Sequence, residues 1–162
     1  MKGKAAVFTT VGEPMEIREF PLPELEPGAV LVKVNMANIC GSDLHIWHGE
    51  LAGGMGSGPR ILGHEMVGRV HELGPGVIAD SLGRPLAVGD RVVYDYFFPC
   101  GRCYTCLSGT PAACLMRLAY HGAPCEGHPH FTGAYAEFYY VRPGQHVFKV
   151  PDELPDEVVA PV

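Results

Sequence analysis

Four cysteines lie close together in one stretch of the chain, and they constrain it more than any other feature. They follow the spacing C-x2-C-x2-C-x7-C and are Cys100, Cys103, Cys106 and Cys114. Thiolates this close in sequence can surround one Zn²⁺ tetrahedrally, with Zn–S bonds of about 2.3 Å. Four sulfur ligands leave no open coordination position, so we expect a structural zinc site rather than a catalytic one.

Two other interpretations of this cysteine cluster stay open. Two disulfides would suit a small secreted module, but nothing at the N-terminus resembles an export signal, and disulfides are rare in the cytosol. An iron–sulfur cluster also takes four cysteines. We expect zinc, in a cytoplasmic protein.

The composition predicts a turn-rich, mainly β domain. The chain has 21 Gly and 15 Pro among 162 residues, and proline is poorly tolerated inside helices and central strands. Such a chain suits short strands joined by tight turns. Because 47% of its residues are hydrophobic, disorder is not expected.

Charge and hydropathy exclude two classes of partner. Twelve basic and 18 acidic residues give a net charge of −6, and there is no cluster of Lys and Arg, which argues against nucleic acid and anionic membranes. No apolar run approaches the roughly 20 residues that span a bilayer. We therefore expect neither nucleic acid nor a membrane as a partner.

Hydrophobic periodicity predicts several strands separated by turns. Strands over 4–10 and 15–20 should pair around a turn at 11–14. The next strand alternates, with Val30, Val32, Val34 and Met36 expected inward and Leu31, Lys33 and Asn35 outward. Further strands are expected over 64–73, 91–98, 134–141 and 147–150, a helical turn or two over 40–48, and the start of a helix at 152–157. The cysteine cluster should then lie on a loop between two strands.

A second group of metal-binding residue types is divided between two short motifs. Cys40 opens Cys-Gly-Ser-Asp-Leu-His, and His64 and Glu65 follow a glycine some twenty residues later. A thiolate and an imidazole suit zinc. Two protein ligands are too few for a tight site, so Glu65 or a residue beyond 162 should supply a third. Each residue alone is weak evidence, since a lone buried cysteine is usually a small hydrophobic residue.

Three polar residues of the first motif could support such a site. Asp43 could accept a hydrogen bond from the far nitrogen of His64 and fix its tautomer. Ser42 and His45 could together relay a proton to solvent. Trp47, Tyr96 and Phe97 could shape a pocket, although aromatic residues of a β-barrel more often belong to the core.

Taken together, the motifs resemble the N-terminal catalytic domain of the zinc-dependent medium-chain alcohol dehydrogenase superfamily. That domain is a GroES-like, partly open β-barrel with short helices and a zinc-binding lobe. The resemblance covers almost the whole chain and rests on motifs in a fixed order: Cys40-Gly-Ser-Asp-Leu-His45, Gly63-His-Glu65, Val67-Gly-Arg-Val70, Leu73-Gly-Pro-Gly-Val77, Gly89-Asp-Arg-Val92, the cysteine cluster and Gly133-Ala-Tyr-Ala-Glu-Phe138.

The resemblance implies a role for each residue of the second group. Cys40 and His64 would ligate a catalytic zinc, with Glu65 as a close or exchanging ligand. Asp43 would support His64, and Ser42 and His45 would carry the proton away from the substrate hydroxyl.

The implied reaction oxidises an alcohol or polyol to a ketone or aldehyde. The alcohol would ionise on the zinc, and a hydride would then pass to NAD or NADP. Some members carry a basic residue that touches the cofactor phosphates where this chain has Gly41, so no cofactor-binding residue is assigned. The Cys-Gly-Ser-Asp motif is closer to the sorbitol- and threonine-dehydrogenase-like branches.

A nicotinamide-binding Rossmann fold is not expected within the chain. That fold needs a G-x-G-x-x-G turn between a strand and a helix, whereas the glycine-rich stretch 53–58 runs into Pro59 and is expected to be a flexible loop. We expect residues 1–162 to form the catalytic domain, with a structural-zinc lobe at 99–115, truncated before the Rossmann domain. Alone it should be inactive and should hold its catalytic zinc weakly or not at all.

The full-length protein is expected to be a homodimer or homotetramer acting on a small-molecule alcohol or carbonyl compound. Two alternatives remain at this point: the zinc-binding GroES-like module of a quinone-oxidoreductase-like reductase, and a non-enzymatic zinc-binding domain. The pairing of Cys40 with His64 opposes the first of these, because such reductases usually lack both ligands.

Overall fold

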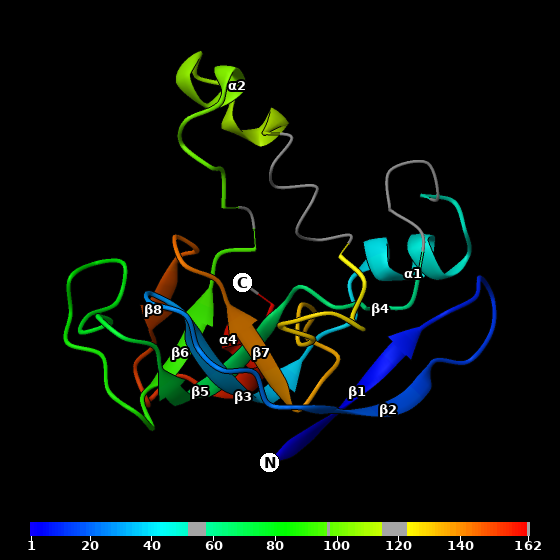
Figure 1. Ribbon diagram of the computed structural model, residues 1–162, viewed down its shortest axis with the longest axis horizontal. Helices are drawn as coiled ribbons and strands as arrows, with labels where there is room; N and C mark the ends of the chain where they lie inside the picture. Colours follow the sequence, from blue (N-terminus) through cyan, green and yellow to red (C-terminus); the bar gives the residue numbers. More distant parts are fainter. Residues whose placement is uncertain (52–57, 97, 115–122, 162) are drawn as a thin grey trace.

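Two antiparallel sheets form the body of the chain (Figure 1). The computed structural model describes residues 1–51, 58–96, 98–114 and 123–161. The three-stranded sheet has the order β2-β1-β4 and the five-stranded sheet the order β7-β3-β5-β6-β8. Their strands are β1 (Lys2–Phe8), β2 (Glu16–Pro21), β3 (Val30–Ala37), β4 (Arg60–Ile61), β5 (Met66–Leu73), β6 (Arg91–Tyr94), β7 (Phe138–Val141) and β8 (Val147–Lys149). The predicted mainly β fold is confirmed.

The helices of the described residues are short. They are α1 (Gly41–Trp47), α2 (Tyr104–Leu107), a 3-10 helix (Pro111–Ala113) and α4 (Asp156–Val159). The helical turns expected over 40–48 and the helix expected near 152–157 are therefore present as α1 and α4. None of these helices has the length or the apolar character to cross a membrane.

Four of the predicted strands are shorter in the structure: 91–98 ends at Tyr94, 147–150 ends at Lys149, and two others begin late. The strand expected over 134–141 begins only at Phe138, because residues before it bond to other segments: Ala134 N–H donates to the carbonyl of Gly63 at 2.9 Å, and Ala6 N–H donates to the carbonyl of Tyr135 at 2.8 Å. The strand expected from residue 64 begins at Met66. His64 and Glu65 therefore precede the strand, although the Glu65 carbonyl still accepts the N–H of Asn38 at 3.0 Å.

The prediction that Leu31 faces outward is wrong. Its side chain is fully buried in a hydrophobic cluster with Phe131, Phe138 and Tyr140. Val30 and Val32 belong to a different cluster on the opposite face of β3. Both faces of this end of the strand are thus covered, and a two-residue alternation cannot distinguish that from a half-buried strand. The glycine-rich stretch 53–57 and Phe97 lie outside the described residues.

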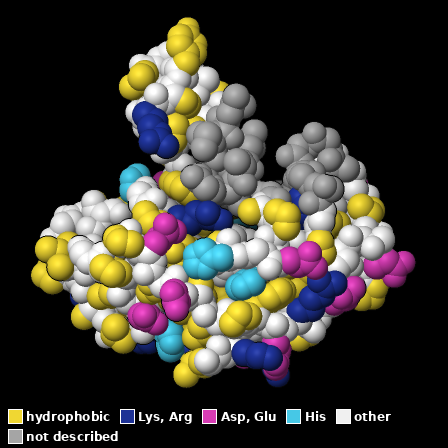
Figure 2. Space-filling view, in the orientation of Figure 1, with side chains coloured by type: hydrophobic (Ala, Val, Ile, Leu, Met, Phe, Trp, Pro, Cys, Tyr) yellow, Lys and Arg dark blue, Asp and Glu magenta, His cyan; other side chains and the backbone are white. Residues whose placement is uncertain are grey.

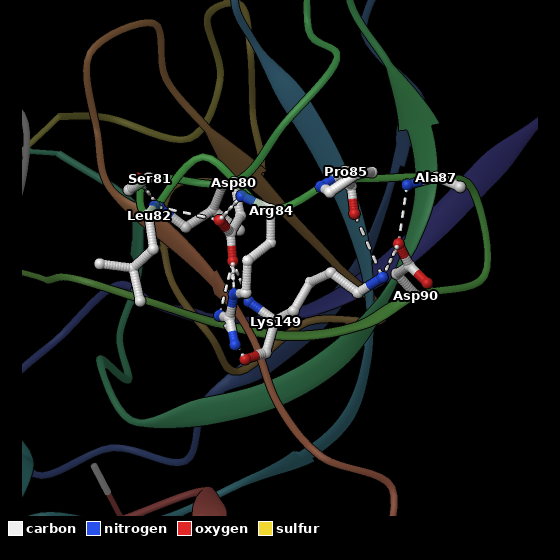
Figure 3. A network of polar contacts seen from close by, with 9 residues as sticks. Asp80, Ser81, Leu82, Arg84, Pro85, Ala87, Asp90 and Lys149 are labelled. Carbon is white, nitrogen blue, oxygen red and sulfur yellow. Dashed lines mark hydrogen bonds and ion pairs between the residues drawn. The ribbon is translucent and has the colours of Figure 1, made fainter.

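A buried carboxylate ties the 79–90 loop to β8 (Figure 3). Asp80 accepts hydrogen bonds from the backbone N–H groups of Leu82 at 3.0 Å, Arg84 at 2.9 Å and Lys149 at 3.0 Å, and from Arg84 Nε at 2.8 Å. Lys149 Nζ lies 2.9 Å from a carboxylate oxygen of Asp90. Burial alone would raise the pKa of Asp80, but these donors outweigh it and lower the pKa to about 2.

We predict that Asp80→Asn lowers the free energy of unfolding at neutral pH by about 1–3 kcal/mol, because buried N–H donors lose their anionic acceptor. The pKa of the folded state, about 2, lies below the ordinary value of 3.8. The stabilisation is therefore complete above about pH 4 and disappears as the pH falls through 2. Urea unfolding at pH 7 and at pH 3 checks this: the difference between wild type and variant should shrink at pH 3.

The matched control is Asp152→Asn, since the Asp152 side chain is 78% exposed. This change should leave stability within about 0.5 kcal/mol of wild type. An Asp80→Asn deficit that is equally large at both pH values would contradict the assignment to the ionised carboxylate.

Candidate metal centres

The first candidate centre begins at the N-terminus of α1, where Asp43 fixes the position of Cys40. The backbone N–H of Cys40 donates to Asp43 Oδ2 at 3.0 Å, and the N–H of Asp43 donates back to the Cys40 carbonyl at 3.1 Å. The Cys40 side chain also faces the backbone N–H of Asp43, so the two residues form a capping box, which satisfies backbone groups at a helix start. It also directs the Cys40 thiol toward the segment between β4 and β5.

That segment supplies two further donors, His64 and Glu65. It turns at Gly63, which has a φ of +85° and lies against the Tyr135 ring: a Cβ there would meet a ring carbon at 2.6 Å. Only glycine accepts this backbone conformation and this contact together. The Cys40 sulfur, a His64 ring nitrogen and a Glu65 carboxylate oxygen then all lie within 4.8 Å of one another. The structure therefore brings together the three residues that the sequence proposed as catalytic-zinc ligands.

Asp43 faces the Nδ1 side of the His64 ring. His64 Nδ1 is 3.5 Å from Asp43 Oδ1, while Nε2 faces Glu65 Oε1 at 3.9 Å and Ser42 Oγ at 3.4 Å. The Asp43 interaction is the main cause that raises the pKa of His64 to about 9 in the metal-free chain. A carboxylate at Nδ1 leaves Nε2 to bind a metal.

The electrostatics around Cys40 favour its thiolate. The hydrogen bond from Ser42 is the main cause that lowers the pKa of the Cys40 thiol, and His64 adds to it. Asp43 is itself buried, and burial alone would raise its pKa. Hydrogen bonds with His64, Tyr135 and Cys40 outweigh that effect and lower the pKa of Asp43.

Ser42 and His45, predicted as a proton relay, occupy different positions relative to this centre. Ser42 Oγ contacts His64 directly. His45 is more than half exposed, and its Nδ1 is hydrogen-bonded to the Glu50 carboxylate. Glu50 was not found from the sequence, because a contact between residues five apart at the end of a helix has no sequence pattern.

A cavity of about 490 Å³ lies elsewhere, beside residues 21–26, but one of about 430 Å³ opens next to the candidate ligands. His64 and Glu65 line it, together with residues of β6 and β8, and its walls include Tyr96 and Phe148. The ring centroids of His64 and Tyr96 are 4.8 Å apart. Trp47 instead donates its indole N–H to the carbonyl of Glu13 at 2.8 Å. Of Trp47 and Tyr96, the two described aromatic residues considered from the sequence, Tyr96 lies at this cavity.

The second candidate centre is the cysteine cluster, on a lobe that stands away from the sheets (Figure 1). The Sγ atom of Cys103 lies 3.4 Å from that of Cys106 and 3.8 Å from that of Cys114, and the sulfurs of Cys100 and Cys106 are 3.9 Å apart. A tetrahedron with Zn–S bonds of about 2.3 Å has S–S edges of about 3.8 Å. The geometry of the four cysteines therefore fits one zinc ion with no open position.

The lobe has little hydrophobic core of its own among the described residues. No residue of α2 is buried, Tyr104 and Leu107 are exposed, and hydrophobic side chains are visible on its surface in Figure 2. We expect a segment that buries so little apolar surface to gain its order from metal binding.

The Alcohol dehydrogenase GroES-like domain family matches residues 26–152 of the chain. The chain belongs to this family. It is 38% identical to an alcohol dehydrogenase of Geobacillus stearothermophilus, over 98% of this chain and 43% of that protein. It is 36% identical to an L-threonine 3-dehydrogenase of Pyrococcus horikoshii, over 94% of this chain and 40% of that one. The expected superfamily and its threonine-dehydrogenase-like branch are thus confirmed.

A solved structure agrees with the fold. An alcohol dehydrogenase from Thermotoga maritima superposes with a TM-score of 0.89 at 33% identity, over 99% of this chain and 44% of that one. The GroES-like chain therefore spans less than half the length of the relatives that it matches.

Two buried cysteines offer a matched test of the lobe. Cys114 belongs to the cluster, whereas Cys125 lies in the hydrophobic cluster around Phe131, and both are fully buried. We predict that Cys114→Ala abolishes chelator-resistant zinc binding, because three thiolates no longer close the tetrahedron. Cys125→Ala should leave zinc content unchanged. Zinc per chain, measured by elemental analysis after gel filtration, checks both; equal zinc loss in the two variants would contradict the assignment.

Proposed function

We propose that this chain is the zinc-binding catalytic half of a zinc- and NAD(P)-dependent alcohol dehydrogenase that converts an alcohol or polyol to a ketone or aldehyde. One observation carries the proposal: the donors of Cys40, His64 and Glu65 lie within 4.8 Å of one another, beside a cavity of about 430 Å³. A structural site would be closed by four protein ligands, whereas three beside a cavity leave a position for a substrate oxygen.

The donor set fits zinc. A thiolate, an imidazole and a carboxylate are all common zinc ligands. The lowered pKa of the Cys40 thiol favours the thiolate, which is the form that binds zinc. When bound there, zinc supplies a Lewis acid that makes an alcohol hydroxyl more acidic. Family membership supports the same reaction class, since the matching relatives include alcohol and threonine dehydrogenases.

In this proposal, the polar residues around the centre orient His64 and transfer the proton of the substrate. Asp43 holds His64 through Nδ1, so that the imidazole cannot rotate away from its position at the cavity. Ser42, with its hydroxyl 3.4 Å from His64 Nε2, takes the proton of the substrate hydroxyl. His45 lies one turn further along α1 and receives that proton, because residues three apart on a helix are neighbours. Its pairing with Glu50 at the surface lets the proton pass to solvent.

The aromatic wall of the cavity serves to position the substrate. Tyr96 and Phe148 line the cavity together with Asp95. Apolar rings favour the carbon skeleton of an alcohol, and they exclude water that would compete for the open position. This arrangement opposes the two alternative functions, because neither a zinc-independent reductase nor a non-enzymatic zinc module needs three donors assembled beside a cavity.

The hydride acceptor in this proposal is NAD or NADP, bound by another part of a longer protein. The chain spans 43% of the first relative, and all strand pairs among the described residues are antiparallel. A dinucleotide-binding fold uses parallel strands with helical crossovers. A homodimer or homotetramer stays a prediction for that longer protein.

We predict that the chain takes up a second zinc ion, at least about 100-fold more weakly than the first, since one site offers four thiolates and the other three mixed donors. Cys40→Ser should abolish the second binding event and leave the first unchanged. Competition titration with a chromogenic chelator measures both affinities. Two zinc ions still bound by Cys40→Ser would show that Cys40 is not a ligand.

We also predict that the 162-residue chain alone gives no turnover of primary, secondary or polyhydric alcohols with NAD or NADP. Hydride transfer needs a bound nicotinamide held against the substrate, and the centre described here supplies only the substrate side. Absorbance at 340 nm with zinc-loaded chain checks this. Measurable turnover that disappears in Cys40→Ser would overturn the need for a second domain.

A further inference from the structure

Tyr135 reaches the buried side of the first centre from a part of the chain remote from both metal-binding motifs. We propose that Tyr135 is a positioning residue, which acts through Asp43 to hold Cys40 and His64 in place for a bound metal ion. The inference rests on the proposed function of this centre, and it assigns Tyr135 no contact with substrate or metal.

The contacts converge on one carboxylate. The Tyr135 hydroxyl donates to Asp43 Oδ2 at 2.7 Å, and the same oxygen accepts the backbone N–H of Cys40 at 3.0 Å. The other oxygen accepts the N–H of Gly63 at 3.2 Å and faces His64 Nδ1 at 3.5 Å. Of these four contacts to Asp43, the one from Tyr135 is the shortest. Oδ2 has two of the four contacts, from the Tyr135 hydroxyl and from the Cys40 N–H.

The backbone around Tyr135 is held on both sides, so its hydroxyl has little freedom to move. Its N–H donates to the carbonyl of Leu62 at 3.0 Å, and its carbonyl accepts from the N–H of Ala6 at 2.8 Å. The ring packs directly against Gly63, where any Cβ would clash with it. The segment that carries His64 and the segment that carries Tyr135 are therefore joined by backbone bonds as well as by ring packing.

The hydroxyl can only donate in this position. Burial and the neighbouring Asp43 carboxylate raise the pKa of Tyr135, so the phenol keeps its proton. An ionised Asp43 has acceptor sites only. If the hydroxyl is removed, Oδ2 retains the single bond from Cys40, and the carboxylate gains freedom to rotate away from His64.

The test compares Tyr135→Phe with Tyr140→Phe. Tyr140 also donates its hydroxyl to a carboxylate, Glu26 Oε1 at 3.0 Å, but that bond lies outside the candidate centre. Both substitutions keep the aromatic ring and remove one such hydrogen bond, so their effects on the unfolding temperature of the metal-free chain should be similar. The two variants should differ in their affinity for metal.

Titration with Co²⁺ distinguishes the two centres, because the tetrathiolate site and the mixed-donor site have different absorption bands. Loss of a residue that is hydrogen-bonded to a metal ligand weakens metal binding about 10- to 100-fold. Tyr135 contacts Asp43, which in turn contacts the ligand His64. We therefore expect Tyr135→Phe to weaken binding of the second Co²⁺ equivalent by about 10-fold, the lower end of that range. The first equivalent should be unchanged, and Tyr140→Phe should affect neither.

Three results would overturn the inference. Unchanged affinity of the second equivalent in Tyr135→Phe would show that Asp43 is held without the hydroxyl, and the proposed function would stand. Equal weakening of both equivalents would show a general loss of structure. Uptake of only one equivalent by the wild-type chain would remove the mixed-donor centre, and with it both the proposed function and this inference.

Discussion

The ionised carboxylate of Asp43 is the constraint on which the rest of the candidate catalytic centre depends. Its side chain is 4% exposed, and a buried charge is costly unless every acceptor site is used. The chain meets that requirement with donors from the residue before α1, from the link before β5 and from residue 135. Satisfying one buried charge therefore aligns three segments, and the donors of Cys40, His64 and Glu65 are brought together as a consequence.

The two metal centres differ in how they depend on the fold. The four cysteines of the lobe come from one short stretch, and their backbone is organised by local bonds such as Leu107 N–H to the Cys103 carbonyl. The mixed-donor centre instead depends on the tertiary fold. Gly63 and Tyr135 come from distant parts of the chain, and they meet through backbone hydrogen bonds between their two segments and through ring packing. Metal can order the first centre, whereas the fold must order the second.

This difference also decides what could be predicted from sequence. The lobe was predictable because its ligands are close in the chain, and the pair Cys40 and His64 because each lies in a recognisable motif. Tyr135 and Asp43 are 92 positions apart, and no periodicity marks such a contact. Leu31 was placed wrongly for a related reason: alternation shows which residues share a face, but a second hydrophobic cluster covers the face that was expected to be exposed. The late start of β7 reflects backbone bonds from residues 134 and 135 to the segment before β5 and to β1.

The arrangement of the donors bears on whether the mixed-donor centre holds metal weakly or not at all. Glu65 lies near the Cys40 thiol and opposes its ionisation, although Ser42 and His64 outweigh it. A Cys40 thiolate and a carboxylate so close to it would repel each other, and a divalent cation bound between them would relieve that repulsion. The donors are already within 4.8 Å of one another, so binding needs little further ordering of the chain. Three donors with an open position limit the affinity, but their preassembly favours weak binding over none.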